Sequence, residues 1–189
     1  MARIVVTEFV SLDGVMEDPG GAEGFEHGGW TFQFSRGEEG DSFKVDETRE
    51  SDAMLLGRKT YDGFADAWPQ RDGEFADMFN AMPKYVVSST LRDPDGTNST
   101  VLDGDVVEEV GRLRGGPDAT IVVHGSAQLV QTLLANDLVD ELRLMVFPVV
   151  IGSGKRLFGA TDAMKRLRLR SSQIVGDGIA ILVYEPAPS

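Results

Sequence analysis

The order of strand-like and helix-like segments constrains the fold of this chain more than any other feature. Short apolar runs typical of buried strands alternate with segments of helical periodicity through the first two thirds of the sequence. Three strand-like runs then follow one another, separated by glycines: "DELRLMVFPVVIG", "RLRLRSSQIV" and "GIAILVYEP". The alternation of strands with helices predicts parallel strands, because each helix returns the chain to the same end of the sheet. Strands that follow one another without a helix predict an antiparallel edge. We therefore expect one α/β domain over residues 1–189, with a mostly parallel sheet, an antiparallel C-terminal edge and helices on both faces.

The periodicity also predicts where the earlier elements lie. A glycine-rich stretch, "SLDGVMEDPGGAEGFEHGGW", contains many turn residues and is expected to form a long loop after the first strand. The expected strands of this part are 3–10, 53–56, 84–88 and 119–125, and the expected helices are 41–51, 60–67, 72–82, 105–114 and 126–137.

Composition excludes several classes of protein. The chain is 41% hydrophobic and 26% charged, as soluble globular proteins are, and no apolar run reaches the roughly 18 residues of a membrane span. It has no cysteine, so disulfide and thiolate chemistry are excluded. The net charge of −13 argues against nonspecific binding of nucleic acid or anionic membranes. The N-terminus runs directly into a strand pattern without a signal peptide, so we expect a cytoplasmic protein.

A local cationic site stands out against this acidic background. In "AMLLGRKT" a buried strand ends in Gly57, and Arg58, Lys59 and Thr60 follow it. Glycine allows a ligand to approach closely, and an arginine can bind a phosphate with two hydrogen bonds. Thr60 is expected to cap the following helix. The alternative is an ordinary strand-to-helix turn with a solvated basic pair.

Two further strands end in residues that suit an anion. The strand "KYVVSS" ends in the hydroxyls of Ser88 and Ser89, for which an ordinary turn is the alternative. In "VVHGSAQLVQTLL", Gly125 and Ser126 open a helix whose positive N-terminal end suits a pyrophosphate, and a simple helix cap is the alternative. Ligands of such sheets bind beyond the carboxyl ends of the strands, so these segments are expected to lie together.

These motifs, in this order, resemble the dihydrofolate reductase-like superfamily and particularly the reductase domain of bacterial riboflavin biosynthesis, over nearly the whole chain. "SLDG", "DAMLLGRKT", "VVHGSAQLVQTLL" and above all "LVDELRLMVFPVVIGSGKRLF" are similar to that family's motifs. The resemblance implies a three-layer fold, NADPH as the cofactor and hydride transfer to a pyrimidine-, pteridine- or flavin-like ring. It further implies the cofactor-binding residues: Arg58 and Ser89, with Ser88 beside it, at the ribose phosphate, and Gly57, Thr60, Gly125, Ser126 and Ala127 at the pyrophosphate.

Two acidic residues are candidates for a proton donor. Asp41 lies sixteen residues before Gly57, the spacing that the resemblance to folate reductases implies for their acidic residue on the first helix. A partly buried aspartate would have the raised pKa that an acid–base group needs. The alternative is a helix N-cap, because Asp41 precedes a helical segment. Asp13 of "SLDG" is the second candidate, with a turn aspartate before Gly14 as the alternative.

The expected substrate contacts are aromatic. In "GFEHGGWTFQF", Trp30 and Phe34, with Phe25 and Phe32, offer a face for a flat heterocycle, unless two of them anchor the loop to the core. Asp62 lies where the riboflavin-pathway enzymes handle the ribose phosphate of their substrate. The sequence has only two histidines, His27 and His124, so we expect no metal site, and His124 is expected to be packed at a strand end.

Three functions remain open at this point. The first is an NADPH-dependent reductase, similar to the 5-amino-6-(5-phosphoribosylamino)uracil reductases or, alternatively, to dihydrofolate reductases. The second is a module that binds a nucleotide or heterocycle without turnover, and the third is an oligomeric scaffold. The run "ELRLMVFPVVIG" is apolar on both faces, and the resemblance implies dimers built around it, so a homodimer is expected.

Overall fold

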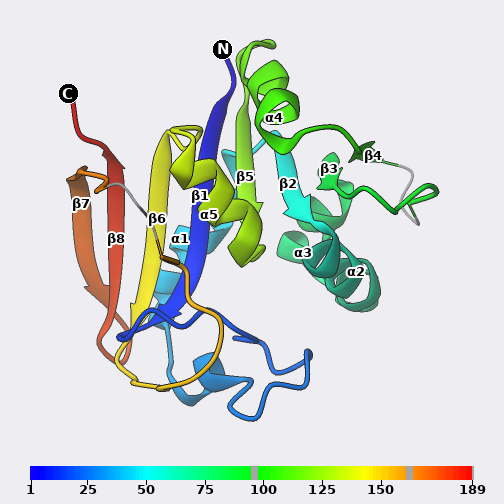
Figure 1. Ribbon diagram of the computed structural model, residues 1–189. Helices are drawn as coiled ribbons and strands as arrows, with labels where there is room; N and C mark the ends of the chain where they lie inside the picture. The colour runs from blue at the N-terminus through cyan, green and yellow to red at the C-terminus, as the bar shows by residue number, and fades with distance from the viewer. Residues whose placement is uncertain (95–97, 161–163, 189) are drawn as a thin grey trace.

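The structure, a computed structural model, describes residues 1–94, 98–160 and 164–188. Its centre is an eight-stranded sheet with the strand order β4-β3-β2-β5-β1-β6-β8-β7 (Figure 1). The strands from β4 to β6 pair in parallel, and β8 pairs antiparallel with both β6 and β7. The expected sheet, mostly parallel with an antiparallel C-terminal edge, is confirmed. The strands are β1 (Arg3–Ser11), β2 (Ala53–Gly57), β3 (Lys84–Val87), β4 (Ser99–Leu102), β5 (Thr120–His124), β6 (Glu141–Phe147), β7 (Leu167–Val175) and β8 (Ile179–Pro186).

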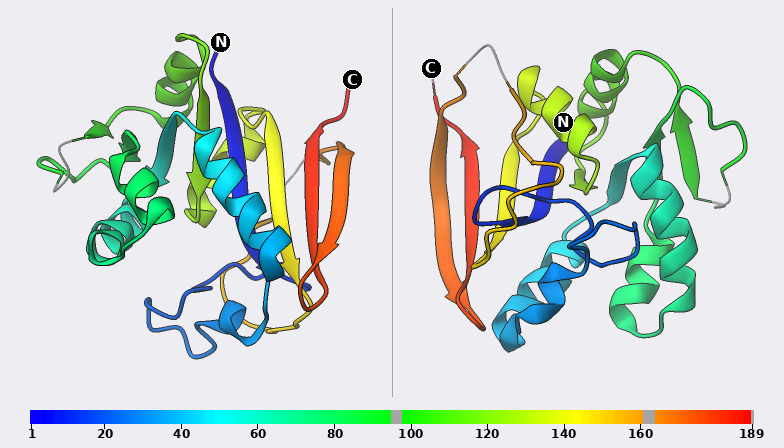
Figure 2. Two further views of the ribbon diagram at one scale, coloured as in Figure 1. Left: turned by 180° about the vertical axis from the view of Figure 1, so that it is seen from behind. Right: turned by 60° about the horizontal axis from the view of Figure 1, so that its bottom comes forward.

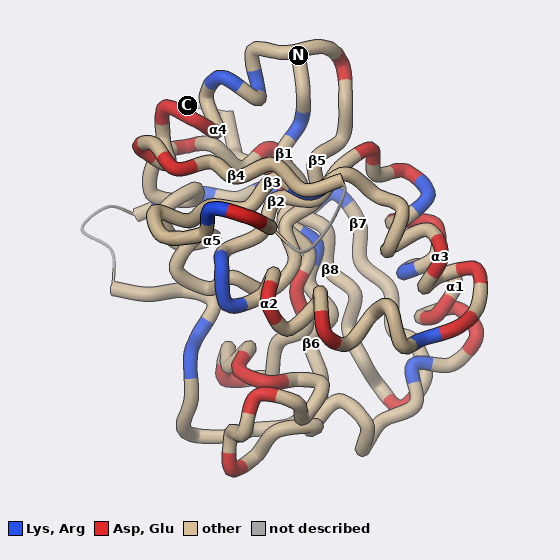
Figure 3. The backbone as a smooth tube through the Cα atoms, turned by 90° about the vertical axis from the view of Figure 1, so that its right-hand side faces the viewer, with Lys and Arg blue, Asp and Glu red and all other residues tan. Residues whose placement is uncertain are grey.

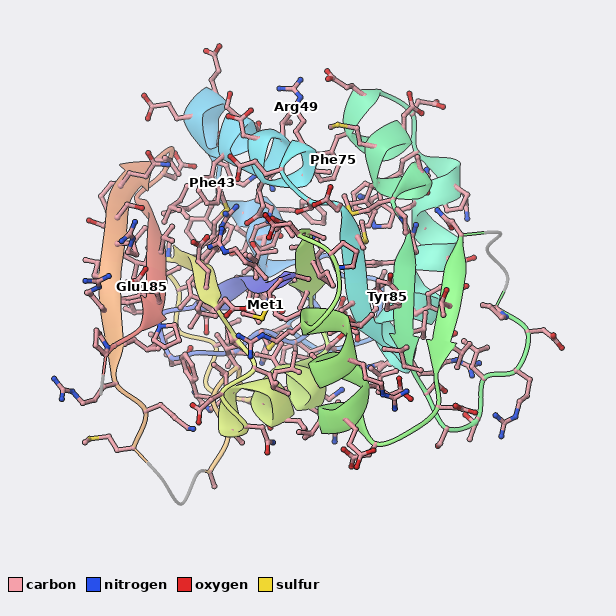
Figure 4. The ribbon with its side chains drawn as sticks, turned by 90° about the horizontal axis from the view of Figure 1, so that it is seen from above. Met1, Phe43, Arg49, Phe75, Tyr85 and Glu185 are labelled. Carbon is pink, nitrogen blue, oxygen red and sulfur yellow. The ribbon has the colours of Figure 1, made fainter. Side chains whose placement is uncertain are left out.

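Helices cover both faces of this sheet, as expected. Seen along the strands, α1, α2 and α3 lie on one side, with Phe43, Arg49 and Phe75 among their side chains, and α4 and α5 lie on the other (Figure 4). The helices are α1 (Gly37–Arg49), α2 (Arg58–Ala67), α3 (Glu74–Ala81), α4 (Val106–Arg114) and α5 (Ala127–Ala135), with short 3-10 turns η1 (Trp30–Gln33) and η2 (Trp68–Gln70).

Alternating strand residues divide the core into clusters on the two faces. Ile4, Val6 and Val10 of β1 belong to the cluster that α4 and α5 cover. On the other face, α2 and α3 pack over β2 and β3, and Trp30 and Phe147 centre a third cluster at the C-terminal strands. The central strands are buried on both faces because helices cover both, which explains their nearly continuous apolar sequence.

The structure differs most from the expectation in one additional strand and in the starts of two helices. The polar edge strand β4, "STVL", has no apolar alternation that would have revealed it. Helix α1 begins at Gly37 instead of Asp41, and no capping side chain marks its start among the described residues. Helix α2 begins at Arg58, directly after β2, instead of at Thr60.

The topology brings the carboxyl ends of the parallel strands to one edge of the sheet. The loops over residues 12–36 and 148–160 lie at this edge, as the view from below shows (Figure 2). An isolated bridge between Val15 and Arg156 joins them. The edge is where a ligand of such a sheet is expected. Among the helices of the described residues, none is long and apolar enough to cross a membrane.

Candidate functional site

Two strand-to-helix turns meet at this edge. Gly125 and Ser126, between β5 and α5, both adopt left-handed backbone conformations, with φ of 57° and 61°. This turn places the Ser126 hydroxyl against the other one, where the Gly57 amide donates to Ser126 Oγ at 2.9 Å. A Cβ at Gly125 would lie 3.1 Å from two atoms of the Thr60 side chain, so both its φ and its surroundings favour glycine. The N-termini of α2 and α5 are thereby held side by side.

Thr60 completes this junction, and here the sequence interpretation needs a correction. Its hydroxyl accepts a hydrogen bond from the Ser126 amide at 3.0 Å, so it links α2 to the turn before α5 and does not cap α2. The N-cap position of α2 is Gly57. The amides of Gly57 and Ser126 are therefore occupied within the protein. Neither helix has a side-chain cap in the part of the chain that the structure describes, so no capping side chain occupies the amides of their first turns.

The cations of the "GRKT" segment are exposed and paired. Arg58 Nε lies 2.8 Å from both carboxylate oxygens of Asp62, one turn further along α2. Lys59 Nζ lies 2.8 Å from Glu23 of the long loop, and the hydrogen bond and charge of Glu23 raise the pKa of Lys59. Asp62, a predicted substrate contact, is thus the partner of Arg58 here. Exposed pairs of this kind are weak, so a phosphate can compete for both cations.

The two serines after β3 differ in their surroundings. Ser88 is buried, and its hydroxyl accepts hydrogen bonds from the amides of Thr90 (3.3 Å) and Leu91 (3.1 Å), which shapes the turn after the strand. Ser89 is exposed. The end of β3 lies beside that of β2, since Gly57 pairs with Val87. The structure therefore leaves Ser89, and not Ser88, available to a ligand next to the "GRKT" segment.

Asp13 ties the two loops at this edge together. Its carboxylate accepts hydrogen bonds from the Ser11 hydroxyl at 2.6 Å and from the amides of Ile151 (3.1 Å) and Gly152 (2.8 Å). The Ser11 hydrogen bond, helped by the two amides, lowers the pKa of Asp13 to about 2. Asp13 is therefore ionised at neutral pH, and these contacts argue against it as a proton donor.

Asp41 lies in a different environment from the one expected. It is inside α1, its side chain is 61% exposed, and it pairs with Arg36 at 2.8 Å. It is therefore neither a partly buried acid nor the helix N-cap, which is Arg36. Helix α1 carries both acidic and basic residues along its length (Figure 3). The buried residues of this helix are instead Gly40, Lys44, Glu47 and Thr48.

Lys44 and Glu47 form a buried polar cluster that the sequence reasoning missed. Lys44 Nζ donates to Thr7 Oγ1 of β1 at 3.0 Å, pairs with Glu47 and lies 5.3 Å from the centre of the Phe9 ring. Arg143 of β6 lies 3.7 Å from the other oxygen of Glu47. Burial is the largest influence and raises the pKa of Glu47, but the Lys44 charge outweighs it together with the smaller effects of His124 and of the hydrogen bonds from Lys44 and Thr7, so the pKa is lowered. Two charges three residues apart on the inward face of an expected helix were the signal that was available.

His124 lies at the end of β5 between this cluster and the aromatic residues of α2 and α3. Its ring centre is 5.4 Å from that of Phe79 and 6.4 Å from that of Phe64, so it is packed, as expected. Burial and then the Lys44 charge lower the pKa of His124 to about 3. The imidazole is therefore neutral at neutral pH.

The aromatic residues of the long loop mostly serve as anchors. Trp30 is only 1% exposed, donates its ring N–H to the Glu17 carbonyl at 2.9 Å and packs edge-on against Phe147. Phe34 packs on the same ring with the centres 5.9 Å apart. Trp30 thus does not offer a face to a substrate. Among the tryptophan and phenylalanine side chains of this loop, only Phe32 is strongly exposed, at 76%. The anchoring alternative accounts for two of these aromatic residues.

Comparison with known proteins relates this geometry to a family. Residues 2–181 match the family model of the RibD C-terminal domain. The chain is 28% identical over 187 residues to YyaP, an uncharacterised protein of Bacillus subtilis (strain 168). The match covers 96% of this chain and 94% of YyaP.

Solved structures show the same fold. A putative riboflavin biosynthesis protein from Shewanella sp. PV-4 is 22% identical and superposes with a TM-score of 0.78. The superposition covers 98% of this chain and 99% of the Shewanella chain. A second structure is a diaminohydroxyphosphoribosylaminopyrimidine deaminase/5-amino-6-(5-phosphoribosylamino)uracil reductase from Thermotoga maritima, which is 15% identical with a TM-score of 0.67. This superposition covers 98% of this chain and 57% of the Thermotoga chain. The dihydrofolate reductase-like fold implied by the sequence is thereby confirmed.

Proposed function

The chain belongs to the RibD C-terminal domain family, and on that premise we propose that it is a reductase that takes hydride from NADPH and transfers it to a flat heterocyclic ring of the pyrimidine, pteridine or flavin kind. One observation carries this proposal. The N-termini of α2 and α5 are held side by side by the hydrogen bonds among Gly57, Thr60 and Ser126, next to exposed cations.

This junction suits the phosphates of a dinucleotide. Helix N-termini carry partial positive charge and outward amides, and two of them side by side fit the two phosphates of a pyrophosphate. The amides of Gly57 and Ser126 are already bonded, so their role is to fix the junction. The pyrophosphate would then be bound by the first turns of both helices, which on the α5 side includes Ala127.

The exposed cations support a preference for NADPH over NADH. Arg58 extends from the start of α2 and Ser89 follows the adjacent strand, so both are available to a ribose 2′-phosphate. The fork of an arginine matches two phosphate oxygens. Binding would exchange the Arg58–Asp62 pair for an arginine–phosphate pair, which costs little because the first pair is exposed.

The cofactor carries the hydride chemistry, and the residues of this chain orient it and shield it from water. The ionised Asp13 joins the loops of residues 12–36 and 148–160 across the carboxyl edge of the sheet. The neutral His124 and Phe64, both partly exposed and in contact with the buried Phe79, would provide an apolar surface at the end of β5. A ring that lies against this surface would be largely withdrawn from water.

Calorimetric titration with NADPH and with NADH tests this proposal. Arg58→Ala should weaken NADPH binding by about tenfold to a hundredfold, the range of a charge-assisted hydrogen bond, and should change NADH binding much less. Arg168→Ala is the matched control, because Arg168 is also exposed and paired with a carboxylate but lies on the far strand β7. Equal losses for both cofactors, or a loss in the control, would overturn the role of Arg58.

A second candidate function is binding without turnover, and the two acids favour it. Asp13 is held ionised and Asp41 is exposed and paired, so neither predicted proton donor has the environment of an acid catalyst. The two functions differ in a single-turnover experiment. A reductase consumes stoichiometric NADPH when pyrimidine, pteridine or flavin substrates are added in turn, whereas a binding module is stabilised by NADPH but leaves it unoxidised with all of them.

A further inference from the structure

Glu8 is an acid where the strand pattern calls for an apolar residue. It lies on β1 and is only 6% exposed. Its neighbours at alternate positions, Ile4, Val6 and Val10, all belong to the apolar cluster under α4 and α5. Because side chains alternate along a strand, Glu8 faces the same cluster. A carboxyl group in such a place costs free energy unless it has a specific partner, so its contacts indicate its role.

The one hydrogen-bond partner of Glu8 among the described residues is the turn before α5. The Gly125 amide donates to Glu8 Oε2 at 3.1 Å, and Oε1 is buried without a partner in the described chain. Gly125 is the residue whose left-handed conformation begins the turn to Ser126. The Glu8 contact thus reaches the junction from inside the protein, while Thr60 reaches it from α2.

We propose that Glu8 is a positioning residue for the dinucleotide site: its carboxyl group holds the Gly125 amide and so fixes the turn that aligns the N-terminus of α5 with that of α2. This inference rests on the proposed function, because the aligned helices are the proposed phosphate site. Without the Glu8 contact the Gly125 amide would be left unpaired, and the Ser126 contacts to Gly57 and Thr60 would lose a support.

The surroundings of Glu8 determine its charge. The charged groups that act on it are Lys44 and Glu47, and both lie on α1, across the sheet. Lys44 already donates to Thr7 and Glu47, His124 of β5 is neutral, and α5 has no ionisable side chain. Burial therefore raises the pKa of Glu8 well above its usual value, despite the Gly125 amide and the Lys44 charge, which lower it.

The raised pKa favours the neutral form of Glu8, and a neutral carboxyl suits a phosphate site. A carboxylate beside the start of α5 would compete with a phosphate for the positive end of that helix. The neutral carboxyl keeps an oxygen for the Gly125 amide without adding negative charge. The folded pKa is raised, so the neutral form is lost as the pH rises through it, and NADPH affinity should fall with rising pH.

Two substitutions separate this role from a merely structural one. Glu8→Gln keeps an acceptor for the Gly125 amide and cannot ionise, and Glu8→Leu removes the acceptor. Calorimetry with NADPH across a series of pH values should show an affinity that falls for the wild type as the pH rises through the raised pKa of Glu8 and stays nearly level for Glu8→Gln. Glu8→Leu should bind about tenfold more weakly than Glu8→Gln. Glu38→Gln on the exposed side of α1 is the control and should follow the wild type.

Hydrogen exchange of the Gly125 amide keeps the inference separate from the proposed function. It needs no ligand, and exchange should be faster in Glu8→Leu than in Glu8→Gln, which should resemble the wild type. If NADPH does not bind the wild type while the exchange follows this order, the proposed function fails and the positioning of the turn stands. Equal exchange in both variants, or equal NADPH affinity of Glu8→Leu and Glu8→Gln, would overturn the role of Glu8.

Discussion

The ion pairs beneath α1 and those at the start of α2 have the same chemistry in opposite surroundings. In the Lys44–Glu47 pair the side chains are 10% and 1% exposed. In the Arg58–Asp62 pair they are 41% and 52% exposed, and in the Lys59–Glu23 pair 63% and 43%. Exposed pairs contribute about 0–1 kcal/mol and separate easily, whereas removing one partner of a buried pair costs several times more. The exposed cations can therefore change partners when a ligand binds, and the buried ones cannot.

Breaking the buried pair should have the largest effect. Lys44→Met leaves the Glu47 carboxylate without its main counter-charge inside the protein, and Thr7 loses its donor. We expect unfolding free energy to fall by about 3–5 kcal/mol in urea denaturation.

A double variant sharpens this prediction. Lys44→Met combined with Glu47→Leu removes both charges, and replacing a buried pair by apolar residues is often nearly neutral. The double variant should therefore be more stable than Lys44→Met alone, although Arg143 then loses one of its acidic neighbours. A double variant that is less stable than the single one would show that the pair is not the source of the effect.

Asp13 lies between these extremes and should give an intermediate effect. Its side chain is 20% exposed, and its pKa is lowered to about 2, chiefly by the Ser11 hydrogen bond. Discounted for solvent exposure, a shift of this size corresponds to about 1–2 kcal/mol. Asp13→Asn should lower the unfolding free energy by about that amount at neutral pH, because the amide cannot carry the charge that the two loop amides and Ser11 stabilise.

The pH dependence of this difference follows from the direction of the shift. A lowered folded pKa contributes stability that is present above about pH 4, the ordinary value of an aspartate, and is lost as the pH falls through about 2. The gap between wild type and Asp13→Asn should therefore shrink on acidification, as chemical unfolding at several pH values would reveal. A constant gap would mean that the effect comes from packing and not from charge.

The smallest effect is expected at Asp41, whose pair with Arg36 is exposed like those of α2. The Asp41 and Arg36 side chains are 61% and 36% exposed. Asp41→Asn should change stability by less than about 0.5 kcal/mol. If the chain reduces a substrate, turnover should also stay nearly unchanged, whereas the loss of a general acid would cost at least about a hundredfold. A hundredfold loss in steady-state turnover would restore Asp41 as the proton donor and contradict its placement on the surface.

Much of the fold could be predicted because most elements carry strong local signals. The apolar run of β2 and the helical spacing of apolar residues in α4 could be recognised in the sequence. The structure adds that Asp105 caps α4 by accepting hydrogen bonds from two amides. Edge strand β4 is polar and the start of α1 is uncapped, so neither had such a signal. These elements are fixed by tertiary pairing, which a single sequence does not display.

The site could be predicted only in part, for a related reason. The order of Gly57, Thr60, Gly125 and Ser126 at strand ends allowed us to expect that they meet, because parallel strands align their carboxyl ends. Which hydrogen bonds they form was beyond reach, since Thr60 could equally cap its own helix. Glu8, by contrast, carried a signal that was overlooked, a charge at an inward position of a buried strand.

The homodimer stays a prediction, but the run "ELRLMVFPVVIG" around which it was expected is not a sheet edge, because β6 pairs with β1 on one side and with β8 on the other. An interface would instead be sought at the exposed C-terminal edge. Several large apolar side chains are exposed in the C-terminal third of the chain. Strand β7 ends the sheet, and eight of its nine residues are exposed. An uncovered edge strand with apolar side chains is a surface that proteins commonly cover. The exposed apolar residues of this region are Val150, Phe158, Met164, Leu167, Leu169 and Ile174.

The central position of β1 has a consequence for how the chain folds during synthesis. This strand is synthesised well before its neighbours β5 and β6, and Val5 pairs with Val122 on one side and with Glu141 on the other. Until those residues have been synthesised, the apolar β1 segment lacks its native partners and can pair with other unpaired strands. Pairing over such sequence distances is also slow. The apolar residues of β1 are therefore exposed in the growing chain until β5 and β6 have been made.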